Sequence, residues 1–433
     1  MSHGSLREKK AIFDQVKKLS NRDGHYPSII TDLAGPKIRI KDVKDDMVLK
    51  TGQNMIIANE QEPDDEKIII SSGFSFGKIS KGGKILINDG RIQLEVSEKI
   101  DPHSLKVKVV IGGKVEKHKG VNFPGVAIDM PPLTSQDVVD LALALDENTD
   151  WVALSFVRSP LDKEVVDAIL EEQGVNVPIM AKIEKWEALE HLEEIINAFD
   201  GVMVARGDLG VEIPQEQVPL VQKRIIEIAN KAGKPVVIAT QLLETMVENQ
   251  TPTRAEISDI ANAILDGTDA LLVTGETAIG KYPEKVVEVL SKVVLETEQT
   301  NDFDNIHQPI ARQQHTADAI SHATCQIAND MDIRVILTLT HSGSTARMIA
   351  RYKPSADIFA LTPIEKTYRQ LSIIWGITPH MINQYSSSDD IPYVSAKFIA
   401  EKDLLNNGEH YVVTGGVPVG VPGTTNFLFV QKA

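Results

Sequence analysis

Cysteine is nearly absent from this sequence, which contains a single one, Cys325, among its 433 residues. One cysteine cannot form an internal disulfide, and such scarce use of the residue is typical of proteins from a reducing compartment. We expect the Cys325 side chain to fill core space on a helix.

Long apolar runs and a surplus of positive charge are also missing. No stretch reaches the roughly 18 apolar residues of a membrane-spanning helix, and the first residues have no apolar core of a secretion signal. The formal net charge of -16 argues against nucleic acid or an anionic membrane as the main partner. The negative net charge does not exclude small anionic substrates, because a local cluster of basic residues can bind them whatever the net charge of the whole chain. We expect a cytoplasmic protein.

What the sequence does contain is a repeated alternation of short β-branched runs with amphipathic helices. Repeated β-α units at this spacing indicate an α/β protein with a TIM (β/α)8-type barrel. We count six of the eight strands that closure needs; their ranges are 29–33, 151–157, 178–184, 201–205, 235–240 and 270–274.

Two other segments have a different texture. From 42 to 126, short alternating runs separated by glycine turns, including Asn88-Asp89-Gly90, predict a small β-barrel domain inserted in the barrel, either a mobile lid or a passive insertion. From 302 to 433 the pattern predicts a C-terminal α/β domain. The barrel domain then comprises residues 1–41 and 127–301.

The stretch from Pro178 to Gly210 carries the strongest chemical signal. Alternation along a strand puts Lys182 and Glu184 on one face, and Asp208 follows the next strand. On neighbouring strands the two carboxylates can converge on one hard cation, with Lys182 beside it. The turn at Gly207 can offer free N–H groups to an anion. The alternative is a pair of surface carboxylates with a solvated lysine.

A second candidate lies in the C-terminal domain. The strand 334–340 runs into the polar loop His341-Ser-Gly-Ser-Thr345 and then a helix, a generic phosphate cradle. The simpler interpretation is an ordinary helix N-cap by Ser342 or Ser344.

Motifs along essentially the whole chain resemble those of pyruvate kinase, in family order. They include 31–39 (Thr-Asp-Leu-Ala-Gly-Pro-Lys-Ile-Arg), 119–125 (Lys-Gly-Val-Asn-Phe-Pro-Gly), 155–158 (Ser-Phe-Val-Arg), 182–184 (Lys-Ile-Glu), 204–214, 239–246, 253–259, 275–278 and the glycine-rich tail 416–426. The resemblance implies a barrel, an inserted lid and a C-terminal regulatory domain, assembled as a homotetramer. It also implies the glycolytic transfer of a phosphoryl group from phosphoenolpyruvate to ADP, giving pyruvate and ATP.

The resemblance also implies roles for individual residues. Glu184 and Asp208 correspond to the ligands of Mg²⁺, which Mn²⁺ can replace, and Lys182 to the group that stabilises the transferring phosphoryl and the enolate. The backbone of Ala205, Arg206, Gly207 and Asp208 corresponds to the substrate-binding helix start. Thr240 corresponds to the hydroxyl near the proton delivery route. The nucleotide-binding positions are His3, Arg39, Lys119 and Asp89. A phosphorylated effector is implied at Thr340, His341, Ser342, Gly343, Ser344 and Thr345.

Lys37 distinguishes subgroups of the family. Potassium-dependent members carry glutamate at this position, so the lysine resembles the potassium-independent subgroup. Its ammonium is expected to act catalytically in place of the ion. Ser2 and Asp32 then correspond to a vestigial monovalent-cation site.

The sequence departs from the family at its front, because the two βα units that precede Ser2-His3-Gly4 in the family are missing. Smaller departures are Lys185, where asparagine is usual, and Thr274, where serine is usual. For the missing units we expect either a start codon assigned too late, which we favour, or a truncated gene. Because six of eight strands leave two exposed barrel edges, we expect the chain as written to fold poorly or lack activity. The alternatives to an active enzyme are an inactive N-terminally truncated remnant or oligomer partner, and a metal-dependent aldolase on a similar barrel.

Overall fold

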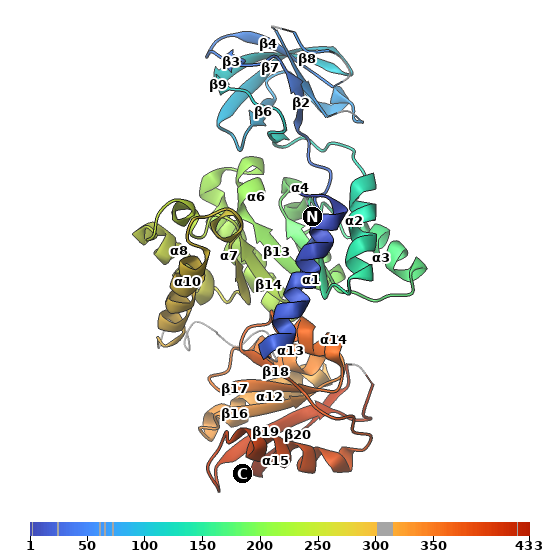
Figure 1. The fold of residues 1–433 in the computed structure, drawn as a ribbon, viewed down its shortest axis with the longest axis vertical. Coiled ribbons are helices and arrows are strands. Elements are labelled where there is room, and N and C mark those ends of the chain that lie inside the picture. The colour runs from blue at the N-terminus through green and yellow to red at the C-terminus, as the bar shows by residue number, and fades with distance from the viewer. Residues whose placement is uncertain are drawn as a thin grey trace.

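The computed structural model describes residues 1, 3–23, 26–59, 62–64, 66–71, 73–300, 315–421 and 423–433. Figure 1 shows three domains stacked along the long axis of the molecule. The β-rich domain lies at the top, the strand-and-helix barrel domain in the middle and the C-terminal domain at the bottom. The domain boundaries given above stay predictions.

The barrel domain is built on a parallel sheet with the order β1-β11-β12-β13-β14-β15. Its strands are β1 (Ile30–Asp32), β11 (Trp151–Leu154), β12 (Ile179–Ile183), β13 (Gly201–Ala205), β14 (Val236–Ala239) and β15 (Ala270–Leu272). Each of the six predicted strand ranges contains one of them. The inner strands β11, β13 and β14 read as continuous apolar runs because both faces are buried, whereas the edge strands β1 and β15 are partly exposed. Val152 and Leu154 pack toward the helices, whereas Trp151 and Ala153 pack in a separate cluster on the other face.

Helices surround this sheet. They are α1 (Leu6–Asp23), α2 (Ser135–Asp146), α3 (Leu161–Glu172), α4 (Trp186–Glu190), α5 (Leu192–Ala198), α6 (Arg206–Glu212), α7 (Val218–Ala232), α8 (Arg254–Leu265), α9 (Gly275–Ala278) and α10 (Pro283–Glu298), with 3-10 turns η2 (Gln215–Gln217) and η3 (Glu244–Val247). Local sequence determines where several of these helices begin. Thr134 and Thr253 each form a capping box, with Asp137 and Glu256 respectively.

The inserted domain, which we call the lid, contains β2 (Ile40–Val43), β3 (Val48–Leu49), β4 (Asn54–Ala58), β5 (Lys67–Ile70), η1 (Phe76–Lys78), β6 (Lys84–Ile87), β7 (Ile92–Asp101), β8 (Ser104–Ile111), β9 (Gly113–Lys114) and β10 (Val121–Asn122). Its main sheet has the order β10-β6-β7-β8-β4-β5-β2. The predicted hairpin is present between β6 and β7, where Asn88 and Asp89 adopt positive φ values of 53° and 56°.

The C-terminal domain has a sheet with the order β18-β17-β16-β19-β20, in which only the β19–β20 pair is antiparallel. Its elements are α12 (Thr316–Asp330), β16 (Val335–Leu339), α13 (Ser344–Ala350), β17 (Asp357–Thr362), α14 (Glu365–Leu371), β18 (Ile377–Met381), η4 (Ser388–Asp390), α15 (Ile391–Lys402), β19 (His410–Gly416) and β20 (Thr425–Lys432). Cys325 lies on α12 against the core of this domain, and burial raises the pKa of its thiol to about 12. It is the helical core residue that the sequence predicts.

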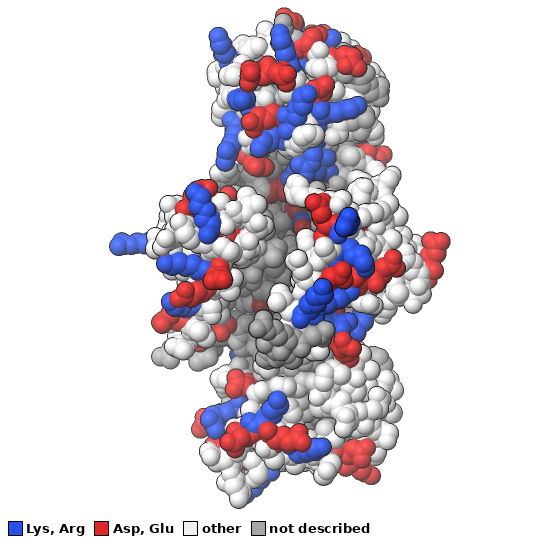
Figure 2. Space-filling view, viewed as in Figure 1, with Lys and Arg blue, Asp and Glu red and all other residues white. Residues whose placement is uncertain are grey.

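The surface carries charges of both signs. On the face shown in Figure 2, Lys and Arg side chains are interspersed with Asp and Glu over all three domains. Within the described part of the chain, no helix is long and apolar enough to cross a membrane.

Candidate active site

The central groups lie at the carboxyl ends of β12 and β13, where functional residues of parallel barrels gather. The two strands are neighbours in register, with Lys182 opposite Met203 and Ile183 opposite Val204. Glu184 follows β12 directly, and Asp208 lies in the first turn of α6 after β13. Lys182 and Glu184 lie together as predicted, and Asp208 follows the neighbouring strand.

Lys182 is held by three partners. Its Nζ donates a hydrogen bond to Oγ of Ser155 at 2.8 Å, and lies 3.0 Å from Oδ1 of Asp32 and 3.1 Å from Oε1 of Glu184. Burial alone would lower the pKa of this ammonium, but the Glu184 and Asp32 carboxylates outweigh burial and raise it. Lys182 is therefore a fixed positive charge, 12% exposed, at the strand ends.

Glu184 is a buried carboxylate, 1% exposed. One of its oxygens accepts the backbone N–H of Phe156 at 2.8 Å, and the other faces Lys182. Burial raises its pKa, and the neighbouring carboxylate of Asp208 acts in the same direction. A cation bound by both carboxylates would offset the repulsion between them.

Asp208 has a cationic partner of its own. Its Oδ1 accepts Nζ of Lys37 at 2.6 Å, and both side chains are about one-fifth exposed. The same ammonium lies 5.8 Å from the ring centre of Phe156. Lys37 comes from the loop after β1, so three strand ends contribute charge to this one site.

The donor set suits a small hard cation. No cluster of three or more His, Cys, Asp or Glu side chains in metal-binding arrangement is present among the described residues. Mg²⁺ does not need one, because it is commonly bound through one or two carboxylates together with water and substrate oxygens. Glu184 and Asp208 fit that mode.

Thr240 and the start of α6 are joined directly. Thr240 follows β14 with a φ of 68°, and its Oγ1 accepts the N–H of Gly207 at 2.9 Å. The expectation that the Gly207 turn presents free N–H groups is wrong for Gly207 itself, because the strand end places the Thr240 hydroxyl above it.

The side chain of Arg206 links α6 to the loop after β14 and to α8. The guanidinium is buried, donates to the carbonyl of Thr240 at 2.7 Å and to that of Gln241 at 3.0 Å, and pairs with Asp259 at 2.6 Å. It fastens the loop after β14 to α6. Any contribution of Arg206 to substrate binding is thus left to its backbone.

Of the four predicted nucleotide-binding residues, only Arg39 and Lys119 are shown to lie close together in the described structure. Arg39 donates to the carbonyl of His118 at 3.0 Å, and Lys119 lies 3.7 Å from Glu116, so Arg39 and Lys119 share the base of the lid. Asp89 is exposed at the β6–β7 turn. His3 is exposed as well, and within the described residues no hydrogen bond joins either of them to Arg39 or Lys119. Ser2 lies outside the described residues.

The sequence did not predict two sets of contacts at this site, those of Ser155 and those of Glu212. The hydroxyl of Ser155 donates to the carbonyl of Leu33 at 2.6 Å while it accepts Lys182, so it orients the lysine. Glu212 binds Nδ2 of Asn122 at 3.0 Å and Nζ of Lys185 at 2.7 Å, which joins the lid to the barrel. The position of Ser155 directly after β11 was the signal for the first contact, because it falls at the same edge of the sheet.

The polar side chains of the loop Thr340–Thr345 form hydrogen bonds within the loop and with Thr425. Thr340 Oγ1 accepts the N–H of Gly343 at 2.9 Å, Ser342 donates to Ser344 at 3.2 Å, and Thr345 bonds Thr425 at 2.7 Å. The N-cap of α13 is Gly343, without a side-chain cap. An N-cap by Ser342 or Ser344 is therefore wrong. Gly343 is required there because its φ is 79° and a Cβ atom would lie 2.9 Å from Leu371.

Comparisons with known proteins agree over nearly the whole chain. Residues 1–287 match the family model described as pyruvate kinase, barrel domain, and residues 318–431 match the one described as pyruvate kinase, alpha/beta domain. A pyruvate kinase of Staphylococcus aureus is 40% identical over 436 residues, covering 99% of this chain and 74% of the relative. One of Staphylococcus epidermidis is 39% identical with the same coverage. The solved structure of a pyruvate kinase from Cryptosporidium parvum superposes with a TM-score of 0.91 at 31% identity, covering 100% of this chain and 89% of that one.

Proposed function

The chain belongs to the pyruvate kinase family, phosphotransferases of glycolysis that form pyruvate and ATP from phosphoenolpyruvate and ADP, and we propose that Lys182, Glu184 and Asp208 carry that reaction. The observation that supports this assignment is the ammonium of Lys182 held 3.1 Å from Glu184, at the strand ends where Asp208 also lies. The family assignment replaces the metal-dependent aldolase that the sequence left open.

The proposed metal ligands are Glu184 and Asp208. A bound Mg²⁺ ion, or Mn²⁺ in its place, would neutralise charge on the phosphoryl and enolate oxygens. Lys182 supplies a second positive charge to the same oxygens from a fixed position, because Ser155 and Asp32 hold its ammonium. A charge that is already oriented costs no reorganisation when the phosphoryl group moves.

The proposed substrate contacts surround these three groups. The backbone of Ala205, Arg206, Gly207 and Asp208 begins α6, where N–H groups lack intrahelical partners, and would bind the substrate carboxylate through N–H groups other than that of Gly207, which is bonded to Thr240. The hydroxyl of Thr240 accepts the Gly207 N–H and keeps its own proton to donate toward the enolate carbon. The nucleotide would lie against Arg39 and Lys119 at the base of the lid, with His3 and Asp89 at its periphery.

The assay for this function follows pyruvate formation from phosphoenolpyruvate. We expect a rate that requires both ADP and Mg²⁺ and that falls to background when either is omitted. Pyruvate release without ADP would contradict a kinase, and the absence of any rate would support the inactive remnant or oligomer partner.

We also propose that the enzyme does not require potassium for activity. The carboxylate of Asp32, a candidate ligand of a monovalent cation, is paired with Lys182 at 3.0 Å, and the ammonium of Lys37 lies 2.6 Å from Asp208. Lys37 thus brings one positive charge to the site without the entropy cost of capturing a free ion. This contact supports the proposed assignment of the chain to the lysine-bearing subgroup.

We expect the unmodified protein to be about equally active in potassium and in tetramethylammonium buffer. Lys37→Glu should lose most activity in tetramethylammonium and regain part of it with potassium. The matched control is Lys41→Glu, an exposed lysine on β2, which should behave like the unmodified protein. Strong potassium activation of the unmodified protein would refute the role of Lys37.

A phosphorylated effector is proposed at the loop Thr340–Thr345, where hydroxyl groups and backbone N–H groups gather at the end of β16. Ser342→Glu adds a negative charge at this loop and should abolish activation by phosphorylated effectors while basal turnover is kept. Ser355→Glu, on an exposed residue of the same domain, is the control. Equal activation of both variants would place the effector elsewhere.

A homotetrameric assembly and a cytoplasmic location are further proposals that follow from the family. Sedimentation of the purified protein tests the first: a monomer at working concentration would contradict it.

A further inference from the structure

The carboxylate of Glu212 lies where the barrel strands, helix α6 and the lid meet. Its Oε1 accepts hydrogen bonds from Nδ2 of Asn122 at 3.0 Å and from Nζ of Lys185 at 2.7 Å. Asn122 ends strand β10 of the lid, Lys185 follows the carboxyl end of β12, and Glu212 is the last residue of α6. One carboxylate oxygen therefore joins three segments that are far apart in the sequence.

This carboxylate depends on the ammonium beside it. The side chain of Glu212 is buried, and its second oxygen, Oε2, has no hydrogen-bond partner among the described residues. A carboxylate that is removed from water is unfavourable unless a partner compensates its charge. Lys185 is the partner that carries a positive charge, since Asn122 is neutral. Without Lys185, Glu212 would regain water if the lid moved away from α6.

The lysine itself is a departure from the family pattern, in which asparagine is usual at position 185. An asparagine is shorter and carries no charge, so it does not supply the ammonium that compensates Glu212. The ion pair of Lys185 with Glu212 is therefore added by the lysine of this chain.

The contacts of Glu212 place the lid relative to the groups of phosphoryl transfer. Asp208, a proposed metal ligand, lies on α6 about one helical turn before Glu212. On the lid side, Asn122 closely follows Lys119, and the backbone of residues 119–121 pairs with that of residues 38–40, which include Arg39. Glu212 therefore helps to set where Arg39 and Lys119 lie relative to the metal site.

The lid approaches α6 at a second point as well. Gly90 lies in the turn between β6 and β7, and a Cβ atom added to it would lie 3.8 Å from the side chain of Val211. Val211 precedes Glu212 on α6. The turn and the Asn122 contact thus place the lid against the same end of the same helix.

We propose that Glu212 and Lys185 are positioning residues for the nucleotide: their ion pair holds the base of the lid against α6 and so aligns ADP with the phosphoryl group. The inference rests on the proposed sites for phosphoenolpyruvate at α6 and for the nucleotide at the base of the lid. Both residues act through Asn122 rather than on the reacting atoms. Alignment is decisive for group transfer, because a misplacement of about 1 Å can cost roughly a hundredfold in rate.

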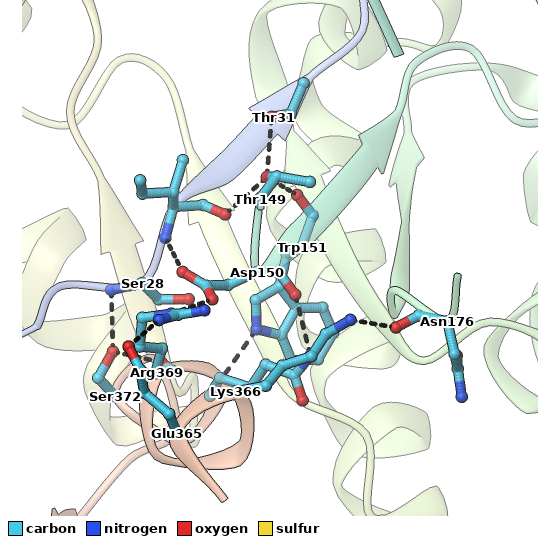
Figure 3. A network of polar contacts seen from close by, with 12 residues as sticks. Ser28, Thr31, Thr149, Asp150, Trp151, Asn176, Glu365, Lys366, Arg369 and Ser372 are labelled. Carbon is cyan, nitrogen blue, oxygen red and sulfur yellow. Dashed lines mark hydrogen bonds and ion pairs between the residues drawn. The ribbon is translucent and has the colours of Figure 1, made fainter. Parts of the chain in front are cut away.

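An ion pair of matching burial joins the barrel to the C-terminal domain, and Figure 3 shows it. Arg369 pairs with Asp150 at 2.7 Å, and the two side chains are 22% and 0% exposed. Those of Lys185 and Glu212 are 22% and 1% exposed. Asp150 precedes β11, at the opposite ends of the parallel strands from Lys185. Loss of Arg369 therefore removes an equally buried pair between domains, away from the lid.

Variants of Lys185 are compared by titration calorimetry with ADP and Mg²⁺ and by steady-state rates. Lys185→Met keeps the length of the side chain but removes its charge. It should weaken ADP binding and raise KM for ADP about tenfold or more, the value of one charge-assisted hydrogen bond. KM for phosphoenolpyruvate should change little, because the start of α6 is kept. Lys185→Arg keeps the charge and should restore most of the ADP affinity.

Asn122→Ala removes the lid end of the same contact and leaves the ion pair of Lys185 with Glu212 in place, so no buried charge is exposed. It should also raise KM for ADP and leave KM for phosphoenolpyruvate little changed. Arg369→Met is the matched control and should leave both KM values and the ADP affinity unchanged.

Lys119→Ala separates the inference from the nucleotide site on which it rests. Weaker ADP binding in Lys119→Ala, with unchanged ADP binding in Lys185→Met and Asn122→Ala, would overturn the inference and leave the nucleotide site standing. Unchanged ADP binding in Lys119→Ala would remove the nucleotide from the base of the lid, and the inference with it. Equal losses for ADP and phosphoenolpyruvate in folded Lys185→Met, or the same ADP loss in Arg369→Met, would show a general structural effect and also overturn the positioning role.

Discussion

Lys182→Met should lower turnover by about a thousandfold while the protein still binds phosphoenolpyruvate. The ammonium is fixed by Ser155, Asp32 and Glu184, and the two carboxylates raise its pKa, so it stays charged throughout the working pH range. Methionine keeps the length and the apolar stem but removes the charge that the transferring phosphoryl group and the enolate require. The measurement is kcat at saturating phosphoenolpyruvate, ADP and Mg²⁺.

The control separates catalysis from folding. Removing the ammonium leaves Glu184 and Asp32 without their shared cation, which also lowers stability. Thermal unfolding of the variant is therefore measured beside its kcat, and Lys163→Met, at a lysine on α3 paired with Asp167, serves as the matched substitution. If folded Lys182→Met kept kcat within a few-fold of the unmodified protein, Lys182 would not be the catalytic cation.

Asp208→Asn should lower kcat/KM by about a hundredfold, because a bound metal supplies several kcal/mol of charge stabilisation and the amide is a weaker ligand for it. The substitution keeps the shape of the side chain and leaves Glu184 as the one charged ligand. The variant should need a much higher Mg²⁺ concentration for half-maximal rate. Rates are measured over a Mg²⁺ and a Mn²⁺ titration.

A change in metal requirement distinguishes a ligand from a residue that only supports Lys37. Lys37 bonds Asp208 at 2.6 Å, so Asp208→Asn also weakens that contact. Loss of the contact alone would lower the rate at every metal concentration without moving the titration midpoint. Asp146→Asn, an exposed carboxylate at the end of α2, should reproduce the unmodified titration. An unshifted midpoint in Asp208→Asn would remove it from the metal site.

Elements with a strong local signal could be predicted from the sequence. The strands of the barrel sheet are short β-branched runs, and the alternation along β12 correctly placed Lys182 and Glu184 together. The Asn88-Asp89-Gly90 turn was recognisable because few other residues accept positive φ at two successive positions.

Contacts between distant segments could not be predicted in this way. The Arg206 side chain reaches 34 and 53 residues along the chain, to Thr240 and Asp259, and no local pattern encodes those partners. The same holds for the Gly207 N–H, which a helix-start argument leaves free until Thr240 is placed above it. The capping of α13 by Gly343 depends on a close approach to Leu371, again a tertiary contact.

The fate of the phosphoryl group tests the central claim most directly. Phosphorus NMR of a mixture of phosphoenolpyruvate, ADP and Mg²⁺ distinguishes the γ-phosphate of ATP from free phosphate. With the unmodified protein we predict that the phosphoenolpyruvate signal is replaced by that of ATP, and that Lys182→Met leaves it nearly unchanged over the same time. Release of free phosphate in place of ATP, or ATP formation at the same rate in both proteins, would contradict phosphoryl transfer at this site.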